Sequence, residues 1–151
     1  MLKAVMRGAI AGAAGTTALN AVTYLDMAVR ARPSSDTPQR AVATIAERAG
    51  HPVPGQGAER ENRLGGLGPL AGIATGVGIG AAAGLLGPVV RRLPTVVGAS
   101  LLGAAAMAGS DLPLTKLGLT DPSAWSKVDW LSDVVPHFAY GLITHKALQR
   151  R

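Results

Sequence analysis

The stretch GPLAGIATGVGIGAAAGLLG, residues 68–87, places a glycine at every fourth position of an apolar run. In water each glycine would cost a helix about 1 kcal/mol relative to alanine. In lipid, small residues allow two helix backbones to touch, and the backbone still needs its intrahelical hydrogen bonds. The stretch therefore predicts a membrane-spanning helix with a groove that receives another helix. The groove is formed by Gly68, Gly72, Gly76, Gly80 and Gly84.

Small residues in two other apolar segments indicate what fills this groove. Gly8 and Gly12 form one matching edge, and Gly98, Gly103 and Ala106 form another. We expect the partner helix to come from the same chain, because four helices first need internal contacts. A second protomer is the alternative that the sequence leaves open.

The composition of the 151-residue chain is that of a membrane bundle rather than a soluble core. Apolar residues make up 48% of the chain, but aromatic residues only 3%. A soluble core of this size draws much of its buried area from Phe, Tyr and Trp. The absence of cysteine excludes disulfides and thiolate chemistry. The many arginines, alanines and glycines are typical of a high-GC bacterial genome.

Four segments are long enough to cross a hydrocarbon layer of about 30 Å. The sequence thus predicts an all-α, four-helix transmembrane bundle, with residues 1–151 as one integral membrane domain. Ser132 is the expected N-cap of the last span, which would place Pro136 in its first turn. The spans are expected at approximately residues 4–29, 66–86, 95–114 and 132–149.

The first span has a second interpretation as a signal peptide. Lys3 and Arg7 would then form its basic region, ahead of an apolar stretch. That stretch is rich in alanine and glycine and poor in leucine, which favours an uncleaved span.

The charges predict that both termini are cytoplasmic. Four spans put the termini on one side, where the short segments carry basic residues and no acid. Basic residues concentrated in short segments mark the cytoplasmic side. These basic residues are Lys3, Arg7, Arg91, Arg92, Lys146, Arg150 and Arg151.

A net charge of +6 makes nucleic acid a partner to consider. The basic residues are dispersed, and no aromatic-rich basic stretch offers stacking. The sequence therefore predicts no nucleic-acid binding.

The first outer loop, residues 30–65, is expected to contain a short helix over residues 38–49. Asp36 or Thr37 would cap it, and its apolar residues share one face. The helix is expected to lie along the membrane surface.

The second outer loop, residues 115–131, is expected to contain another short helix. Asp121 is its predicted N-cap, and Pro122 suits its first position. Trp125 and Trp130 would fit the interfacial belt, although ordinary loop packing explains them equally well.

Polar residues cluster near the predicted outer ends of the spans. Asp26 precedes Arg30 by four residues, and Asp133 precedes His137 by the same spacing, which favours contact on a helix. One interpretation is a proton- or cation-binding site, since histidine titrates near neutral pH. The other is that these groups pair at helix ends near the headgroups. The cluster comprises Asn20, Asp26, Arg30, Asp111, Asp133 and His137.

The sequence predicts no catalytic residues, no cofactor and no metal site. It contains no G-x-S-x-G, H-E-x-x-H, P-loop or dinucleotide-binding fingerprint. Outside the cluster, His145 is expected to reach from the inner rim toward the headgroups.

The last third of the chain contains a spaced pattern of residues that begins with Pro-Leu and ends in a pair of arginines. The positions are Pro113, Leu114, Gly118, Leu119, Thr120, Pro122, Trp130, His137 and Arg150-Arg151. In these positions the segment resembles the C-terminal part of the YagU-type bacterial inner membrane proteins. The resemblance implies a multi-span inner membrane protein, with a suggested link to acid resistance. That family offers no catalytic residues to carry over.

These features predict a small, non-enzymatic structural or accessory protein of a bacterial cytoplasmic membrane. Its partners would be the bilayer and a membrane protein complex or further copies of itself. The alternative is a minor transporter or a proton- or cation-linked permeation unit built on the polar cluster. A third interpretation, a soluble interaction module, predicts that carbonate alone releases the protein from membranes.

Overall fold

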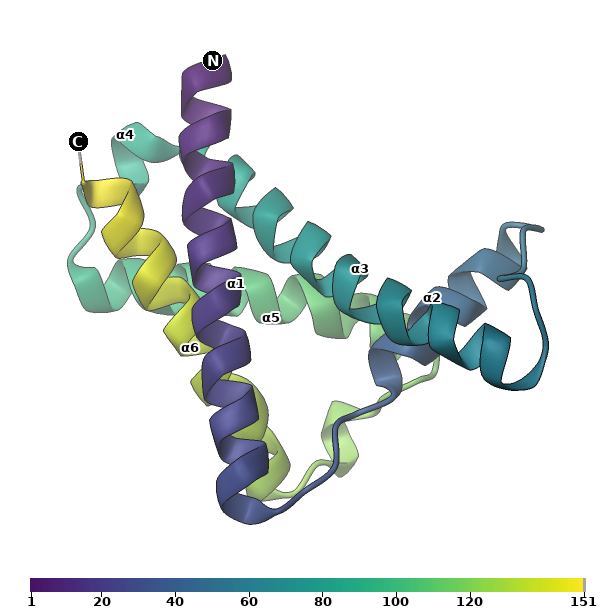
Figure 1. The fold of residues 1–151 in the computed structure, drawn as a ribbon. Helices are drawn as coiled ribbons and strands as arrows, with labels where there is room; N and C mark the ends of the chain where they lie inside the picture. Colours follow the sequence, from purple (N-terminus) through teal and green to yellow (C-terminus); the bar gives the residue numbers. More distant parts are fainter. Residues whose placement is uncertain (151) are drawn as a thin grey trace.

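The computed structural model describes residues 1–150 and is all-helical, with no strand in that range (Figure 1). The all-α prediction is confirmed. Arg151, assigned above to the cytoplasmic end, lies outside the described residues. The long helices are α1 (Leu2–Arg30), α3 (Gly57–Leu85), α5 (Thr95–Lys116) and α6 (Lys127–Gln149). The short ones are α2 (Thr37–Arg48), α4 (Gly87–Val90) and the single 3-10 turn η1 (Pro122–Ala124).

Two of these helices are candidate membrane spans. The shortest long helix, α5, has 22 residues, which corresponds to about 33 Å at 1.5 Å per residue. By length and composition together, α3 and α5 are the helices of residues 1–150 that could cross a membrane. Helices α1 and α6 have the length, with 29 and 23 residues, but a more polar composition.

Helices α1 and α3 lie close together at one end of the molecule and diverge toward the other, where α1 stays beside α6 (Figure 1). Both termini and α4 lie at the end where α1 and α3 are close, called the converged end below. Helix α1 packs against α3 and α6, α5 packs against α6, and α2 packs against α3. The lower halves of α1 and α3 separate, so the bundle is open toward α2 and η1 (Figure 1).

Helices α1 and α3 cross with their backbones in contact. A Cβ added at Gly12 would lie 2.5 Å from the Gly76 carbonyl oxygen, and one at Gly80 would lie 2.6 Å from the Gly12 nitrogen. Gly8 packs against Gly84 in the same way, because a Cβ added at Gly8 would lie 2.8 Å from the Gly84 Cα. Real Cβ atoms essentially never come closer than 3.0 Å to such neighbours. Only glycine therefore fits this crossing.

The glycine groove of α3 is shorter than predicted. An added Cβ at Gly72 would meet no atom within 4 Å, so Gly72 packs against no other helix of the described chain. Gly68 is buried, but its neighbours are Pro38 and Gln39 of α2 rather than α1. The physical reason is the divergence of α1 and α3, which carries α1 away from α3 beyond Gly76.

Helices α5 and α6 form a second crossing on small residues. A Cβ at Gly103 would lie 2.7 Å from the His137 carbonyl oxygen, and one at Gly141 would lie 2.6 Å from the Gly103 nitrogen. The small residues of α5 thus pack mainly against α6, whereas they were expected to offer an edge to the groove of α3.

In α1 and α5, residue size is distributed in the opposite way to that of a soluble protein, whereas α6 buries the large side chains of Tyr140, His145 and Leu148. The buried positions of α1 are Gly8, Ala11, Gly12, Gly15 and Thr16, and those of α5 are small except Leu102. Bulky apolar side chains face outward, with Ile10 69%, Val96 68% and Leu101 57% exposed. The helices therefore pack through small residues and present a broad apolar surface, which marks contact with lipid or protein.

Helix α3 begins earlier than the predicted span. It starts at Gly57, nine residues before position 66, so residues 57–65 are helical rather than loop. Glu59 in the first turn pairs with Arg63 across one turn, at 2.7 Å. An acidic residue in the first turn and such a pair both stabilise a helix start.

Helix α6 also begins earlier, because its N-cap is Ser126 and not Ser132. The Ser126 hydroxyl accepts from the Asp129 backbone N–H, and the Ser126 backbone N–H donates to the Asp129 carboxylate at 2.9 Å. Hydrogen bonds from Ser126 hold the pKa of Asp129 below its usual value. Pro136 consequently lies inside α6 and not in its first turn, while Ser132 donates to the Val128 carbonyl oxygen.

The short helices lie close to their predicted positions. Helix α2 has Asp36 as N-cap but no side-chain capping bond, and η1 has Asp121 as N-cap, whose carboxylate accepts from the Ser123 N–H. The predicted second loop helix is only a single turn. The Trp125 and Trp130 rings pack edge to face, with centroids 5.1 Å apart.

His145 does not reach toward the headgroups, so that prediction is wrong. Its side chain is fully buried, and Nε2 lies 2.9 Å from the Val90 carbonyl oxygen. A carbonyl oxygen only accepts, so Nε2 carries the hydrogen. Gly98 of α5 makes the burial possible, since a Cβ there would lie 2.7 Å from the imidazole Cγ.

Candidate functional site

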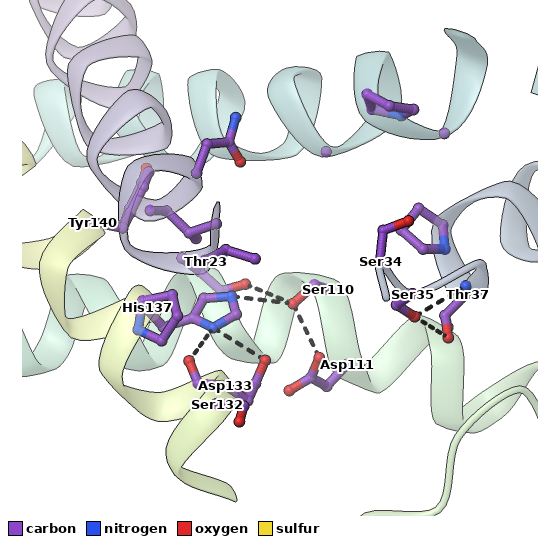
Figure 2. Close-up of a pocket in the computed structure, with 18 of the residues that line it drawn as sticks. Thr23, Ser34, Ser35, Thr37, Ser110, Asp111, Ser132, Asp133, His137 and Tyr140 are labelled. Atoms are coloured by element: carbon purple, nitrogen blue, oxygen red, sulfur yellow. Dashed lines mark hydrogen bonds and ion pairs between the residues drawn. The ribbon is translucent and has the colours of Figure 1, made fainter. Parts of the chain in front are cut away.

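A cavity of about 720 Å³ lies between the diverging halves of the helices (Figure 2). Its lining comes from α1, α2, α3, α5 and α6 and from the connections that follow α1 and α5. The divergence of α1 from α3 opens it, and α2 covers part of the opening because it packs on α3 near Gly68. Leu19, Met27, Ile73 and Leu114 give the cavity apolar walls.

One wall of the cavity carries a histidine between two acidic side chains (Figure 2). His137 Nδ1 lies 2.8 Å from the Asp133 carbonyl oxygen and 3.3 Å from the Asp133 carboxylate. Both neighbours are acceptors, so Nδ1 carries a hydrogen. Nε2 of the same ring lies 3.5 Å from the Ser110 hydroxyl oxygen, which lies 3.1 Å from Asp111 Oδ1.

Each carboxylate of this wall keeps one oxygen without a donor. Oδ2 of Asp111 and Oδ2 of Asp133 are buried and have no hydrogen-bond partner within residues 1–150. The side chain of His137 is only 12% exposed. The wall therefore combines a titratable ring with free acceptor oxygens, an arrangement able to hold a proton or a cation.

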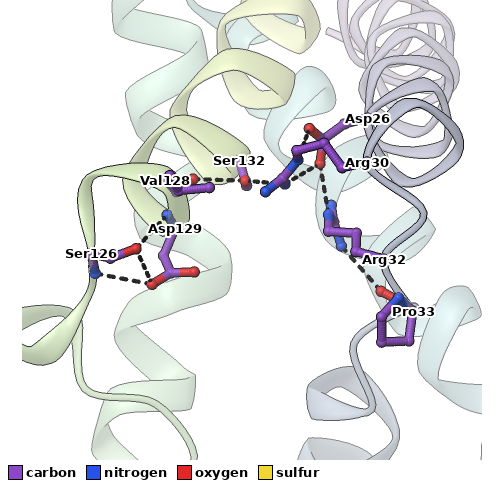
Figure 3. A network of polar contacts seen from close by, with 8 residues as sticks. All are labelled: Asp26, Arg30, Arg32, Pro33, Ser126, Val128, Asp129 and Ser132. Atoms are coloured by element: carbon purple, nitrogen blue, oxygen red, sulfur yellow. Dashed lines mark hydrogen bonds and ion pairs between the residues drawn. The ribbon is translucent and has the colours of Figure 1, made fainter.

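A second polar group ties the end of α1 to α6 (Figure 3). Asp26 accepts from Arg30 Nε at 2.6 Å and from Arg32 Nε at 2.7 Å. Arg30 also donates to the Ser132 hydroxyl at 2.6 Å, which connects the two helices. One carboxylate binds both guanidinium groups, so the charge of Asp26 and those of Arg30 and Arg32 largely offset one another. This group of residues therefore serves as a structural link between α1 and α6.

The polar cluster expected from the sequence is thus divided into two groups. Asp111, Asp133 and His137 lie together on the cavity wall, whereas Asp26 and Arg30 belong to the link. Asn20 also lines the cavity, and it does not belong to either group of hydrogen bonds.

Four polar residues of the site were not predicted from the sequence: Ser110, Arg32, Ser132 and Tyr140. The Tyr140 side chain is buried and its hydroxyl donates to the Gly76 carbonyl oxygen at 2.6 Å. The sequence contains a weak indication that Ser110 belongs to the site, since it directly precedes Asp111. For Ser132 it contains none, because only tertiary packing brings it to Arg30, and Arg32 reaches Asp26 through the local left-handed turn at Ala31 that ends α1.

Comparisons with known proteins give no further guide to the site. No protein-family model, no curated protein and no solved structure matches the chain. The resemblance to YagU-type proteins therefore stays a prediction.

Proposed function

We propose that this chain is a small, non-enzymatic integral membrane protein with four spans. The observation that carries the proposal is the inverted packing of α1 and α5, with mainly glycine and alanine inside and bulky apolar side chains outside. Lipid gives no reward for burying bulky apolar groups between helices, whereas it does allow close backbone contact. Because α1 and α6 pack on the two candidate spans over glycine crossings, they are expected to cross the membrane with them.

The proposed orientation places both termini in the cytoplasm of a bacterial cell. The termini and α4 share the converged end (Figure 1), and the segments there carry Lys3, Arg7, Arg91 and Arg92 without an acid. Dense basic residues favour the cytoplasmic face. The cavity would then open toward the outer face.

The cavity favours proton- or cation-linked permeation over a purely accessory role. An accessory helix bundle needs no space inside it, and ionisable groups within membrane helices are costly, which favours a functional role for those present. Here Asp111, Asp133 and His137 line a common space. We therefore propose that a proton or a small cation binds at this wall during permeation.

The test of permeation is proton and cation flux into liposomes that contain the purified protein. Wild type is expected to conduct, whereas His137→Ala and Asp111→Asn are each expected to lower the flux at least tenfold. Removing either group deprives the wall of its titratable ring or of a charge. Asp121→Asn removes an outer-loop carboxylate that does not line the cavity and is the matched control, expected to conduct as wild type. Absence of flux from every variant, wild type included, would leave the accessory role in its place.

A further inference from the structure

Segments that are distant in sequence bring basic side chains together at the converged end (Figure 1). These segments are the start of α1, the connection from α4 to α5, and the end of α6. Their basic residues within residues 1–150, called the basic end below, are Lys3, Arg7, Arg91, Arg92, Lys146 and Arg150. The same segments contain no Asp or Glu. The fold thus concentrates positive charge at one end of the molecule.

A buried hydrogen bond places the cations of α4 and α6 near one another. His145 Nε2 lies 2.9 Å from the Val90 carbonyl oxygen, and this contact joins α6 to α4. Lys146 directly follows His145, and Arg91 directly follows Val90. The two cationic side chains therefore start from neighbouring stretches of backbone.

The glycine crossing holds the start of α1 at the same end. A Cβ added at Gly84 would lie 2.8 Å from the Gly8 Cα. Arg7 directly precedes Gly8, and α4 begins at Gly87, shortly after Gly84. The basic residues of α1 therefore lie near those that follow α4.

The charges of the basic end are not offset by carboxylates of the described chain. The arginines that form ion pairs within residues 1–150 all lie outside it, and they are Arg30, Arg32, Arg60 and Arg63. Lys146 is half-buried, and the other cations of the basic end are exposed. An exposed group of uncompensated cations attracts an anionic partner.

Exposed apolar side chains alternate with these cations. Leu2 and Met6 directly precede Lys3 and Arg7, and they are 73% and 54% exposed. Val89 in α4 is 66% exposed. Residues 1–10, 86–97 and 141–150 contain no Phe, Tyr or Trp on which a nucleic-acid base could stack. A molecule that carries both an anionic group and hydrocarbon chains matches the two kinds of side chain.

We propose that the basic end binds anionic phospholipid, with the headgroup paired to its cations and the acyl chains against the apolar side chains of α1 and α4. This inference rests on the membrane placement given under the proposed function, but not on permeation. Near an anionic membrane surface each Lys or Arg contributes about 1 kcal/mol, which is about fivefold in affinity. Several cations at one end therefore favour an anionic lipid over a zwitterionic one.

The preference is measured by native mass spectrometry of the detergent-purified full chain. The protein is incubated with equal amounts of phosphatidylglycerol and phosphatidylcholine that carry the same acyl chains, and the bound lipids are counted. Both lipids contain a phosphate, but only phosphatidylglycerol has a net negative charge. Wild type is expected to retain phosphatidylglycerol at least tenfold over phosphatidylcholine. Raising the salt from about 0.1 M to about 1 M shortens the screening length from about 10 Å to about 3 Å and is expected to weaken this preference.

Matched double variants assign the preference to the basic end. Arg7→Gln/Arg92→Gln removes two exposed cations from different segments of it and is expected to lower the preference at least fivefold. Arg40→Gln/Arg48→Gln removes two exposed cations from α2, which lies away from the converged end (Figure 1), and is expected to bind as wild type. Far-UV circular dichroism of each variant is expected to show the helical content of wild type.

Equal retention of the two lipids by wild type would overturn the inference. The same loss of preference in both double variants would also overturn it, because the preference would then follow total charge rather than the basic end. If proton flux occurs without a lipid preference, the inference fails and the proposed function stands. If phosphatidylglycerol is preferred and no flux occurs, permeation fails and the lipid site stands.

Discussion

Gly80→Ala is expected to destabilise the bundle by about 3 kcal/mol, near the upper end of the usual cost of overpacking. The added methyl group would meet the backbone of Gly12, and a backbone cannot rotate away as a side chain can. Helices α1 and α3 would have to separate, which also weakens the contacts of Gly8 and Gly84. The gain in helix propensity from glycine to alanine, about 1 kcal/mol at most in water, is too small to compensate.

Gly78→Ala is the matched control for this substitution. Gly78 lies two residues away on α3, and a Cβ there would meet no atom within 4 Å. Reversible unfolding in mixed micelles is expected to show a stability equal to or slightly above that of wild type for Gly78→Ala. If Gly80→Ala is as stable as Gly78→Ala, the backbone contact between α1 and α3 does not hold the bundle.

His145→Ala is expected to cost about 3 kcal/mol, because it combines the loss of a large buried side chain with the loss of a buried hydrogen bond. The imidazole is fully buried against Gly98, and it donates to the Val90 carbonyl oxygen. Without it, that carbonyl keeps only the 3.2 Å hydrogen bond from the Leu93 N–H, and α4 loses its polar contact with α6.

Two further variants separate the contributions of His145. His145→Phe refills much of the space but has no donor, so it is expected to recover part of the stability. His51→Ala removes an exposed histidine of the loop before α3 and is expected to leave stability unchanged. If His145→Ala unfolds in mixed micelles at the same detergent fraction as His51→Ala, the buried hydrogen bond contributes nothing.

The helical class and the approximate positions of the long helices were predictable, because long apolar runs and local spacing determine them. The pairs Asp26–Arg30 and Asp133–His137 are in contact, as the four-residue spacing indicates. The early start of α6 also had a signal that was missed, namely Ser126 followed three residues later by Asp129. Such local features depend on neighbours in sequence alone.

The remaining features depend on how helices cross, which no local pattern determines. The regular spacing of the glycines predicts one continuous groove, but the divergence of α1 leaves Gly72 without a partner. The contact of Ser110 with His137 and the burial of His145 follow from the α5–α6 crossing at Gly98 and Gly103. The cavity itself is a product of the same divergence.

The placement of the helices in a membrane is tested most directly by labelling single cysteines. The chain has no cysteine, so His51→Cys, Ser123→Cys and Arg92→Cys each introduce one exposed thiol. A membrane-impermeant thiol reagent is added to sealed right-side-out and inverted vesicles. We expect positions 51 and 123 to react only in right-side-out vesicles, and position 92 only in inverted vesicles. Equal labelling of all three positions from one side would contradict the four-span membrane bundle.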